Sequence, residues 1–166
     1  SRGPILRVAI SAAQNWIASS TGLQLNLHRL DSGNRFRSLN LQSSRALGAA
    51  PDGSWLAFTT NSTHLIRYRP ATDSFDAPAV ETGTLSDLVV SADGRRLVAL
   101  PLSGEAWTVD VATWRVAARP KGLAPSLAAW ARDASRLTLG FGGVARTYDL
   151  DASEPRFTRD WGTDLI

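Results

Sequence analysis

The side chains that most often act as general bases or metal ligands are scarce in this sequence. Its 166 residues include two histidines, His28 and His64, and no cysteine. A catalytic histidine needs a nucleophile or a carboxylate beside it, and neither histidine lies near a Gly-x-Ser-x-Gly nucleophile motif. The lack of cysteine excludes thiolate zinc sites, disulfides and cysteine nucleophiles. The sequence therefore predicts no catalytic residue, no metal and no cofactor.

Three aspartates recur at regular spacing, in the pattern of turn residues. Asp52 precedes Gly53, Asp93 precedes Gly94, and Asp133 stands in a third, similar segment. Asp bonds to its own backbone and Gly adopts positive φ, so the Asp-Gly pair favours tight turns. The offsets are 93 − 52 = 41 and 133 − 93 = 40 residues. We therefore interpret these five residues as the structural turns of a repeat.

The segments around these turns indicate four copies of one unit. Residues 47–58, 88–99 and 127–138 align with one another, and a diverged copy at 8–18 places Trp16 at 55 − 16 = 39 residues before Trp55. The second half of each unit repeats as well, with two further short strands. We expect one domain over residues 4–166, with unit boundaries that the following ranges give: 4–39, 40–80, 81–120 and 121–166.

The repeating unit favours strands. Its apolar runs are short, rich in strand-forming residues and separated by Gly, Pro, Asp and Ser. No run approaches the roughly 20 apolar residues that cross a bilayer. A period of about 40 residues with four strands per unit is typical of propeller blades. We predict an all-β fold, a β-propeller of four four-stranded antiparallel blades that is part of a larger or composite propeller.

Residues 50–58 and 91–98 carry a family resemblance. They resemble the SPDGxxLA turn between the first two strands of WD40 blades and of related YVTN and TolB-type bacterial propeller repeats. Residues 109–113 are similar to the WDLxTG end of the third strand, whose Asp is replaced in the first two units by Leu30 and Arg69. The Gly-His pair that precedes the first strand of typical WD40 blades is absent. The chain thus resembles a degenerate WD40-like repeat.

The resemblance implies where partners bind. Such propellers hold protein partners on the rim formed by the loops from the second to the third strand and from the fourth strand to the next first strand. In this sequence the implied loops are 43–45, 60–64, 81–86, 101–105, 121–126 and 140–143. The candidate partner-binding residues on them are Arg45, Asn61, His64, Thr84, Glu105 and Lys121.

The first strand of each blade lines the central channel of a propeller, where an enzymatic site would lie. We expect these strands at residues 8–11, 47–50, 88–91 and 127–130, which contain no acid and no histidine. The sequence therefore predicts that the protein is not an enzyme. The alternative is a small-molecule-binding or enzymatic propeller of the lactonase or TolB-associated type, which needs polar groups that converge on the channel.

The charge of the chain argues against nucleic acid as a partner. The formal net charge is +3, and 18 − 1 = 17 of the basic residues are arginines that are dispersed along the chain, without the clustered stripe that phosphate binding needs. We expect protein partners and no membrane span. The predicted function is a non-catalytic interaction, scaffold or sensor module of a larger bacterial protein or complex, in the cytoplasm.

Four blades of this kind are too few to close a ring, because WD40-like propellers usually need more. We expect the first and last units to pack against further blades, from a partner chain, a second copy or a cleaved remainder of the same protein. Residues 155–162 should form or replace an outer strand at such a junction, where Trp161 becomes buried.

Overall fold

The computed structural model describes residues 4–21, 23–40, 46–60, 64–76, 83–121 and 124–161. These residues form sixteen strands and no helix, so they contain no helix of the length and apolar character that crossing a membrane requires. The strands make four antiparallel sheets, and in each sheet the four strands lie side by side in chain order. The predicted all-β fold of four four-stranded antiparallel sheets is confirmed.

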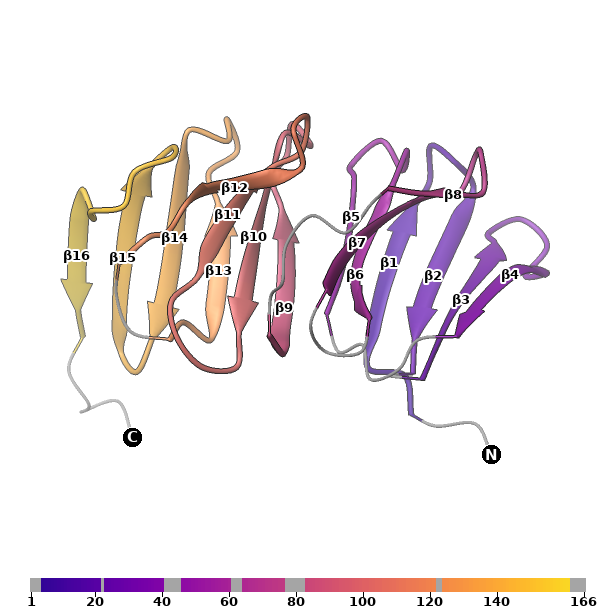
Figure 1. The fold of residues 1–166 in the computed structure, drawn as a ribbon, viewed down its shortest axis with the longest axis horizontal. Helices are drawn as coiled ribbons and strands as arrows, with labels where there is room; N and C mark the ends of the chain where they lie inside the picture. Colours follow the sequence, from indigo (N-terminus) through magenta and orange to yellow (C-terminus); the bar gives the residue numbers. More distant parts are fainter. Residues whose placement is uncertain are drawn as a thin grey trace. The chain divides into compact units, whose positions relative to one another are not determined.

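The chain divides into two compact units, and the first unit, Ser1–Leu88, contains the first two sheets (Figure 1). The first sheet consists of β1 (Arg7–Ser11), β2 (Trp16–Ser20), β3 (Gln24–Arg29) and β4 (Arg35–Asn40). The second sheet consists of β5 (Leu47–Ala49), β6 (Leu56–Thr60), β7 (His64–Arg69) and β8 (Ser74–Phe75). The strands are short because turn residues interrupt every apolar run.

The second unit, Val89–Ile166, contains the other two sheets, and the division between the units falls inside β9. The third sheet consists of β9 (Leu85–Val90), β10 (Arg96–Pro101), β11 (Trp107–Asp110) and β12 (Arg115–Ala118). The fourth consists of β13 (Leu127–Trp130), β14 (Arg136–Phe141), β15 (Val144–Asp149) and β16 (Phe157–Asp160). The outer strand β16 lies in the segment 155–162 that was expected to supply one, and Trp161, which was expected to be buried at a junction, is 52% exposed in the single chain.

Strand pairing corrects the alignment of the first unit with the others. Asp110 pairs with Arg96 and Asp149 with Arg136 at the start of the second strand of their sheets. The residue in that place in the first sheet is Arg29, which pairs with Trp16. Arg29, and not Leu30, therefore stands where the repeat has Asp. The sequence alignment was one residue off because β3 ends at Arg29, before the turn begins.

A left-handed residue closes the turn between the first and second strands of every sheet, at the same position in the last three sheets and one residue later in the first. One residue in each turn has a left-handed backbone, with φ of 54°, 72°, 69° and 56°, and its N–H donates to the carbonyl three residues earlier. These residues are Asn15, Gly53, Gly94 and Ala134. Glycine adopts this conformation without strain, whereas other residues pay a steric penalty. A left-handed residue therefore closes the turn even where the Asp-Gly sequence is lost.

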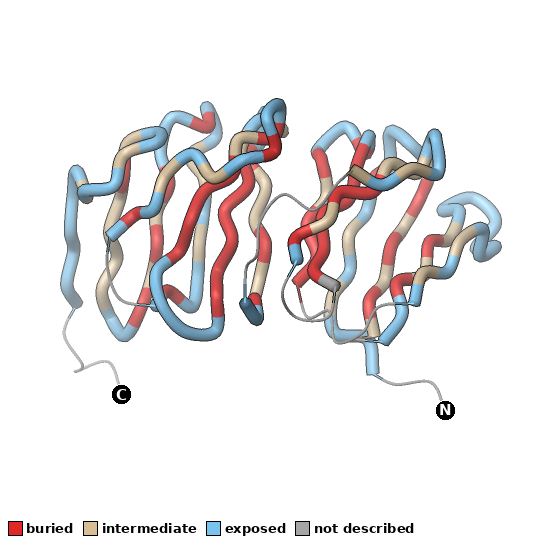
Figure 2. Tube along the Cα trace, in the orientation of Figure 1, coloured by how far each residue is buried: buried red, intermediate tan, exposed pale blue. Residues whose placement is uncertain are grey.

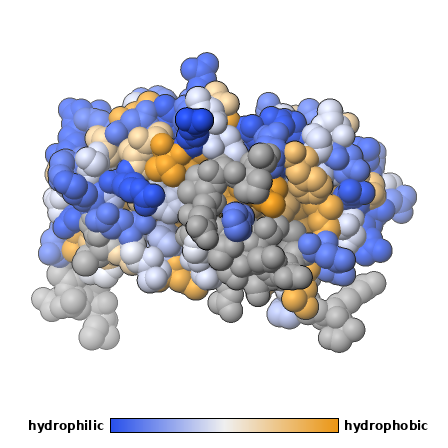
Figure 3. All heavy atoms as spheres, viewed as in Figure 1, coloured by the Kyte–Doolittle hydropathy of each residue, from blue (hydrophilic) through white to orange (hydrophobic). Residues whose placement is uncertain are grey.

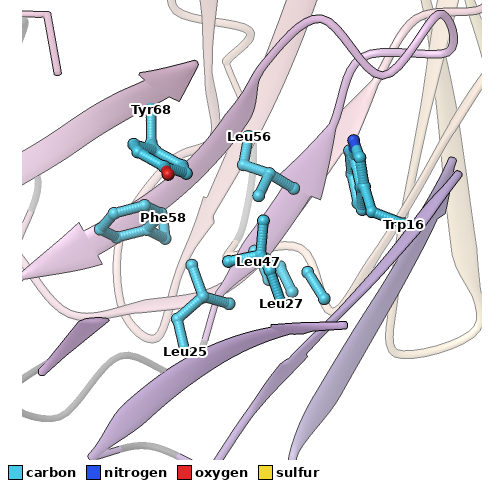
Figure 4. Close-up of a cluster of buried hydrophobic side chains, with 8 residues drawn as sticks. Trp16, Leu25, Leu27, Leu47, Leu56, Phe58 and Tyr68 are labelled. Carbon is cyan, nitrogen blue, oxygen red and sulfur yellow. The ribbon is translucent and has the colours of Figure 1, made fainter. Parts of the chain in front are cut away.

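The core of the first unit lies between its two sheets. Figure 4 shows Leu25 and Leu27 of β3 close to Leu56 and Phe58 of β6, with Trp16 beside them. All five side chains are at most 2% exposed. The indole N–H of Trp16 donates to the carbonyl of Gly53, at 3.3 Å. Apolar burial and one buried hydrogen bond thus fix the first sheet against the first turn of the second.

The core of the second unit repeats this arrangement between the third and fourth sheets. Val98 and Leu100 of β10 pack with Leu137 and Leu139 of β14. On Figure 2, β10 is coloured as buried over most of its length and β14 alternates between buried and less buried residues, whereas β16 is exposed throughout. The indole N–H of Trp130 donates to a backbone carbonyl on β9, at 3.1 Å. Each unit therefore consists of two sheets packed around an apolar core.

We predict that Gly53→Ala destabilises the first unit strongly. A Cβ at this position would lie 1.9 Å from Oγ of Ser11 and 2.5 Å from its Cβ, so the first turn of one sheet would have to move away from the other. The left-handed backbone adds a penalty of about 1 kcal/mol, and overpacking adds roughly 1–3 kcal/mol. Urea unfolding measures the sum.

Gly33→Ala is the matched control. Gly33 has nearly the same φ, +68° against +72°, but nothing lies within 4 Å of the Cβ it would acquire. This variant should show only the backbone penalty of about 1 kcal/mol. Equal losses in the two variants would show that Gly53 is needed for its backbone alone and that the close approach to Ser11 is unimportant.

Candidate interaction surface

Each sheet has two unlike ends, because its strands alternate in direction. At one end lie the hydrogen-bonded turns from the first to the second strand and from the third to the fourth. At the other end lie the loops from the second to the third strand and the connections that leave the fourth strand. The first end is called the turn end and the second the loop end. The resemblance to WD40 propellers places partner binding at the loop end.

The turn end is held by the repeated aspartates, as predicted. The Asp52 carboxylate accepts hydrogen bonds from N–H and Oγ of Ser54, at 3.0 and 2.7 Å, and Asp133 accepts the same pair from Ser135. Asp93 accepts from Oγ of Ser91 at 2.6 Å and from the backbone N–H of Arg95 at 3.0 Å. These bonds lower the pKa of all three carboxyl groups. The turn end is therefore rigid and alike in three sheets.

The structure places four of the six predicted partner-binding residues. His64 begins β7, Thr84 immediately precedes β9, Glu105 lies in the loop before β11, and Lys121 follows β12; all four are exposed. Arg45 and Asn61 lie outside the described residues. Three of the four, His64, Thr84 and Glu105, are thus found next to the loop end of their sheets.

Lys121 was expected in a loop at the loop end, but it contacts the turn end of the fourth sheet. Its Nζ donates to Oε1 of Glu154 at 2.6 Å, and its backbone N–H donates to the carbonyl of Ser153 at 2.8 Å. Both partners belong to the segment between β15 and β16, at the turn end of the fourth sheet. The ion pair raises the pKa of the Lys121 ammonium group, and the carboxylate of Glu105 adds to the effect. The chain after β12 therefore runs along the fourth sheet.

Tyr148 and Arg146 of β15 anchor this segment. The Tyr148 hydroxyl donates to the carbonyl of Lys121 at 2.5 Å, and Arg146 Nη1 reaches the same oxygen at 3.4 Å. Tyr148 is buried, which raises the pKa of its phenol, and the guanidinium of Arg146 lies over the Phe141 ring, 5.3 Å from its centroid. Lys121 and Glu154 therefore form an ion pair at a defined place on the second unit.

The first strands carry charged residues that the sequence analysis did not assign to them. We expected no titratable group there, but β1 begins at Arg7 and β9 begins at Leu85, so that β9 includes Asp87. Arg7 Nε lies 3.4 Å from Oδ1 of Asp87, and Arg7 Nη2 donates to the carbonyl of Ser86 at 2.9 Å. The expectation was wrong because both strands extend beyond their apolar cores. The two charges neutralise one another in the first unit.

The histidines do not sit in a recognisable catalytic arrangement. His28 lies on β3, and its Nδ1 donates to the carbonyl of Gly33 at 3.0 Å, a contact that closes the adjoining turn. His64 lies on the second sheet, at the start of β7. Within the described part of the chain, no three His, Asp or Glu side chains gather as a set of metal ligands.

Sequence reasoning missed Tyr148, Arg146 and Glu154 as neighbours of Lys121. The one available signal was Tyr148 itself, which takes the place of the usual Trp in a third-strand motif. In the view of Figure 3, hydrophilic residues cover much of the described surface and hydrophobic atoms form separate patches. Recognition at these loops would therefore depend mainly on polar and charged contacts.

We predict that the protein loses stability as the pH falls below about 4, the ordinary pKa of an aspartyl group. The pKa of Asp93 is lowered in the folded state, first by the Ser91 hydroxyl and then by the Arg95 N–H. A lowered pKa contributes stability above the unfolded value and loses it as the pH falls through the folded value. In Asp93→Asn, whose amide oxygen keeps an acceptor, the urea midpoint should fall less between pH 5 and pH 2 than in the wild type; parallel curves would contradict this.

Comparison with known proteins supports the fold and leaves the family open. No family model and no curated protein matches the chain. Among solved structures, Kuenenia stuttgartiensis hydrazine synthase, a propeller-containing protein, matches with a TM-score of 0.79 at 12% sequence identity. The match covers 93% of this chain and 48% of the other, so the chain spans about half the length of that solved chain. At this identity the likeness concerns the fold alone, and the four sheets are the blades of a β-propeller-like fold.

Proposed function

We propose that the chain is a WD40-like, non-catalytic interaction module that serves as a scaffold or sensor within a larger bacterial protein or complex, and that its loop end binds a protein partner. The observation that carries the proposal is the contrast between the two ends of each sheet. Three turn ends share one aspartate turn, whereas the connections at the loop end differ in length, from residues 142–143 to residues 76–84.

This contrast fits a binding module because loops on a rigid scaffold change freely in length and sequence without loss of the fold. The three aspartate turns keep one length, because each of them fixes the register of two strands. Exposed Thr84 and Glu105 supply polar groups next to the loop end. Partner contacts of this composition favour specificity over hydrophobic affinity.

The WD40-like assignment gains support from the end of the third strand in the third sheet. Oδ1 of Asp110 accepts from N–H and Oγ1 of Thr113, at 2.7 and 2.8 Å. The Asp and Thr of the resembling motif thus close the turn to the fourth strand together. In the fourth sheet, Asp149 keeps the acid and forms an ion pair with Arg156 at 3.1 Å.

The enzymatic alternative needs polar groups that converge from the first strands. The described first strands contribute Arg7 and Asp87, and these pair with each other. An ion pair of this kind is a structural contact in most proteins, because catalysis also needs a proton-transferring group beside it. The non-catalytic reading is therefore the one we propose.

We predict that Glu105→Lys weakens capture of the partner, because it reverses a charge at the loop end. The chain is immobilised, extract from its source organism is passed over it, and retained proteins are quantified by mass spectrometry. A rim charge reversal should reduce the retained partner several-fold at low salt and less at high salt.

Arg132→Glu is the control, since Arg132 is exposed in the turn between β13 and β14, at the turn end of the same unit. It should leave retention unchanged. If both variants retain the partner equally, or if nothing is retained above an empty support, then the proposed role of the loop end is wrong. Circular dichroism establishes that both variants are folded.

A further inference from the structure

Two sheet faces, one in each unit, expose apolar side chains along a first strand. On β1, Val8 is 51% exposed and Ile10 is 59% exposed. On the fourth sheet, Leu127 of β13 is 71% exposed and Phe157 of β16 is 56% exposed. Apolar residues on a sheet face normally pack against another layer, because exposed apolar faces favour association. We therefore expect another layer of structure to cover each of these two faces.

The exposed face of the first sheet has the same position in the repeat as the face of the second sheet that packs against the first sheet. Residues paired across neighbouring strands share a face, and the first sheet presents two such rows: Val8, Ser19 and Asn26, and Ile10, Ile17 and His28. The corresponding rows of the second sheet are Leu47, Phe58 and Ile66, and Ala49, Leu56 and Tyr68. The latter rows pack against the first sheet.

The exposed face of the fourth sheet has the same position in the repeat as the other face of the first sheet, which packs against the second sheet. Its rows are Leu127, Gly140, Ala145 and Arg159, and Ala129, Thr138, Thr147 and Phe157. The corresponding rows of the first sheet are Arg7, Ser20 and Leu25, and Ala9, Ala18 and Leu27. Ala9, Ala18, Leu25 and Leu27 of these rows pack against the second sheet. One chain therefore exposes two faces that, by their position in the repeat, could pack on each other in the way that the first sheet packs on the second.

We propose that a second copy of this chain occupies these faces, head to tail: the fourth sheet of each copy packs on the first sheet of the other. The two junctions would repeat the packing of the first sheet on the second. Two copies contribute 2 × 4 = 8 sheets, which lies within the range of roughly four to eight blades found in closed propellers.

The polarity of the two faces favours a second copy over an ordinary apolar blade. On both faces the first strand is apolar, but the strands beyond it carry bonded polar pairs. Oγ of Ser38 donates to Oδ1 of Asn26 at 2.9 Å on the first sheet, and the hydroxyls of Thr138 and Thr147 lie 3.0 Å apart on the fourth. The packed faces carry apolar residues at the corresponding positions: Ile66 in place of Asn26, Ala18 in place of Thr138, and Leu27 in place of Thr147. Both open faces are therefore polar in their third strand, at Asn26 and Thr147, where the packed faces are apolar.

The polar side chains on both faces favour a second copy of the chain over an apolar blade as the structure that covers them. Covering Asn26 with an apolar blade would leave amide groups without partners, at a cost of about 1–3 kcal/mol for each unsatisfied group. Threonine hydroxyls from the other open face can donate to them and accept from them. The inference does not rest on the proposed partner binding, because it uses sheet faces instead of the loop end.

The test is the mass of the chain in sedimentation equilibrium, with charge variants at matched positions. Ala9 and Ala49 pack on the same cluster in the first unit, and the corresponding exposed positions of the open faces are Ala129 and Ile10. The wild type should show twice its 17.8 kDa. Ile10→Lys and Ala129→Glu should each be monomeric at concentrations where the wild type is dimeric.

Mixing the two variants should restore the dimer, because one junction then pairs Lys with Glu and the other is native. Leu102→Lys changes an exposed apolar residue in the loop before β11, 55% exposed, and should leave the dimer intact. A monomeric wild type, a dimer that both variants leave unchanged, or a mixture that stays monomeric would overturn the proposal. Open assemblies larger than a dimer would also overturn it, since they would show that the ring does not close.

Discussion

The structure depends on one local constraint, the left-handed residue in the turn between the first and second strands of each sheet. That residue closes the turn with a backbone hydrogen bond to the carbonyl three positions earlier. The closed turn fixes the register of two strands, and register decides which side chains share a face. In the first unit the same turn also supplies the Gly53 carbonyl that accepts from Trp16. Strand register and sheet packing are therefore coupled at one residue.

The aspartate turns explain why so much of the fold could be predicted from the sequence. Their chemistry is local: Asp52 and Asp133 each bond to the serine two residues later, and such signals survive in a sequence without any tertiary information. Repetition at 41 and 40 residues then identifies sixteen short strands without the need to recognise each one. The first turn lacks both Asp and Gly, but Asn15 also tolerates a left-handed backbone.

What failed to follow from the sequence depends on contacts between distant residues. The ends of β1 and β9 extend past their apolar cores, so Arg7 and Asp87 could be assigned to first strands only from pairing and contact. The place of Lys121 is decided by Ser153 and Tyr148, residues that lie 153 − 121 = 32 and 148 − 121 = 27 positions later. Local propensity carries no information on either. Charged groups at chain connections are therefore the least predictable part of the candidate surface.

The turn end, the loop end and the exposed sheet faces are subject to different physical requirements. The turn end must keep its hydrogen bonds, so its residues are restricted to those that accept from the backbone or adopt positive φ. The loop end has no such requirement, and its composition is free to match a partner. The open faces of the first and fourth sheets are constrained by each other, since an apolar first strand beside polar pairs fits only a surface patterned in the same way. Their polarity is therefore informative about the occupant, in a way that a uniformly apolar face would not be.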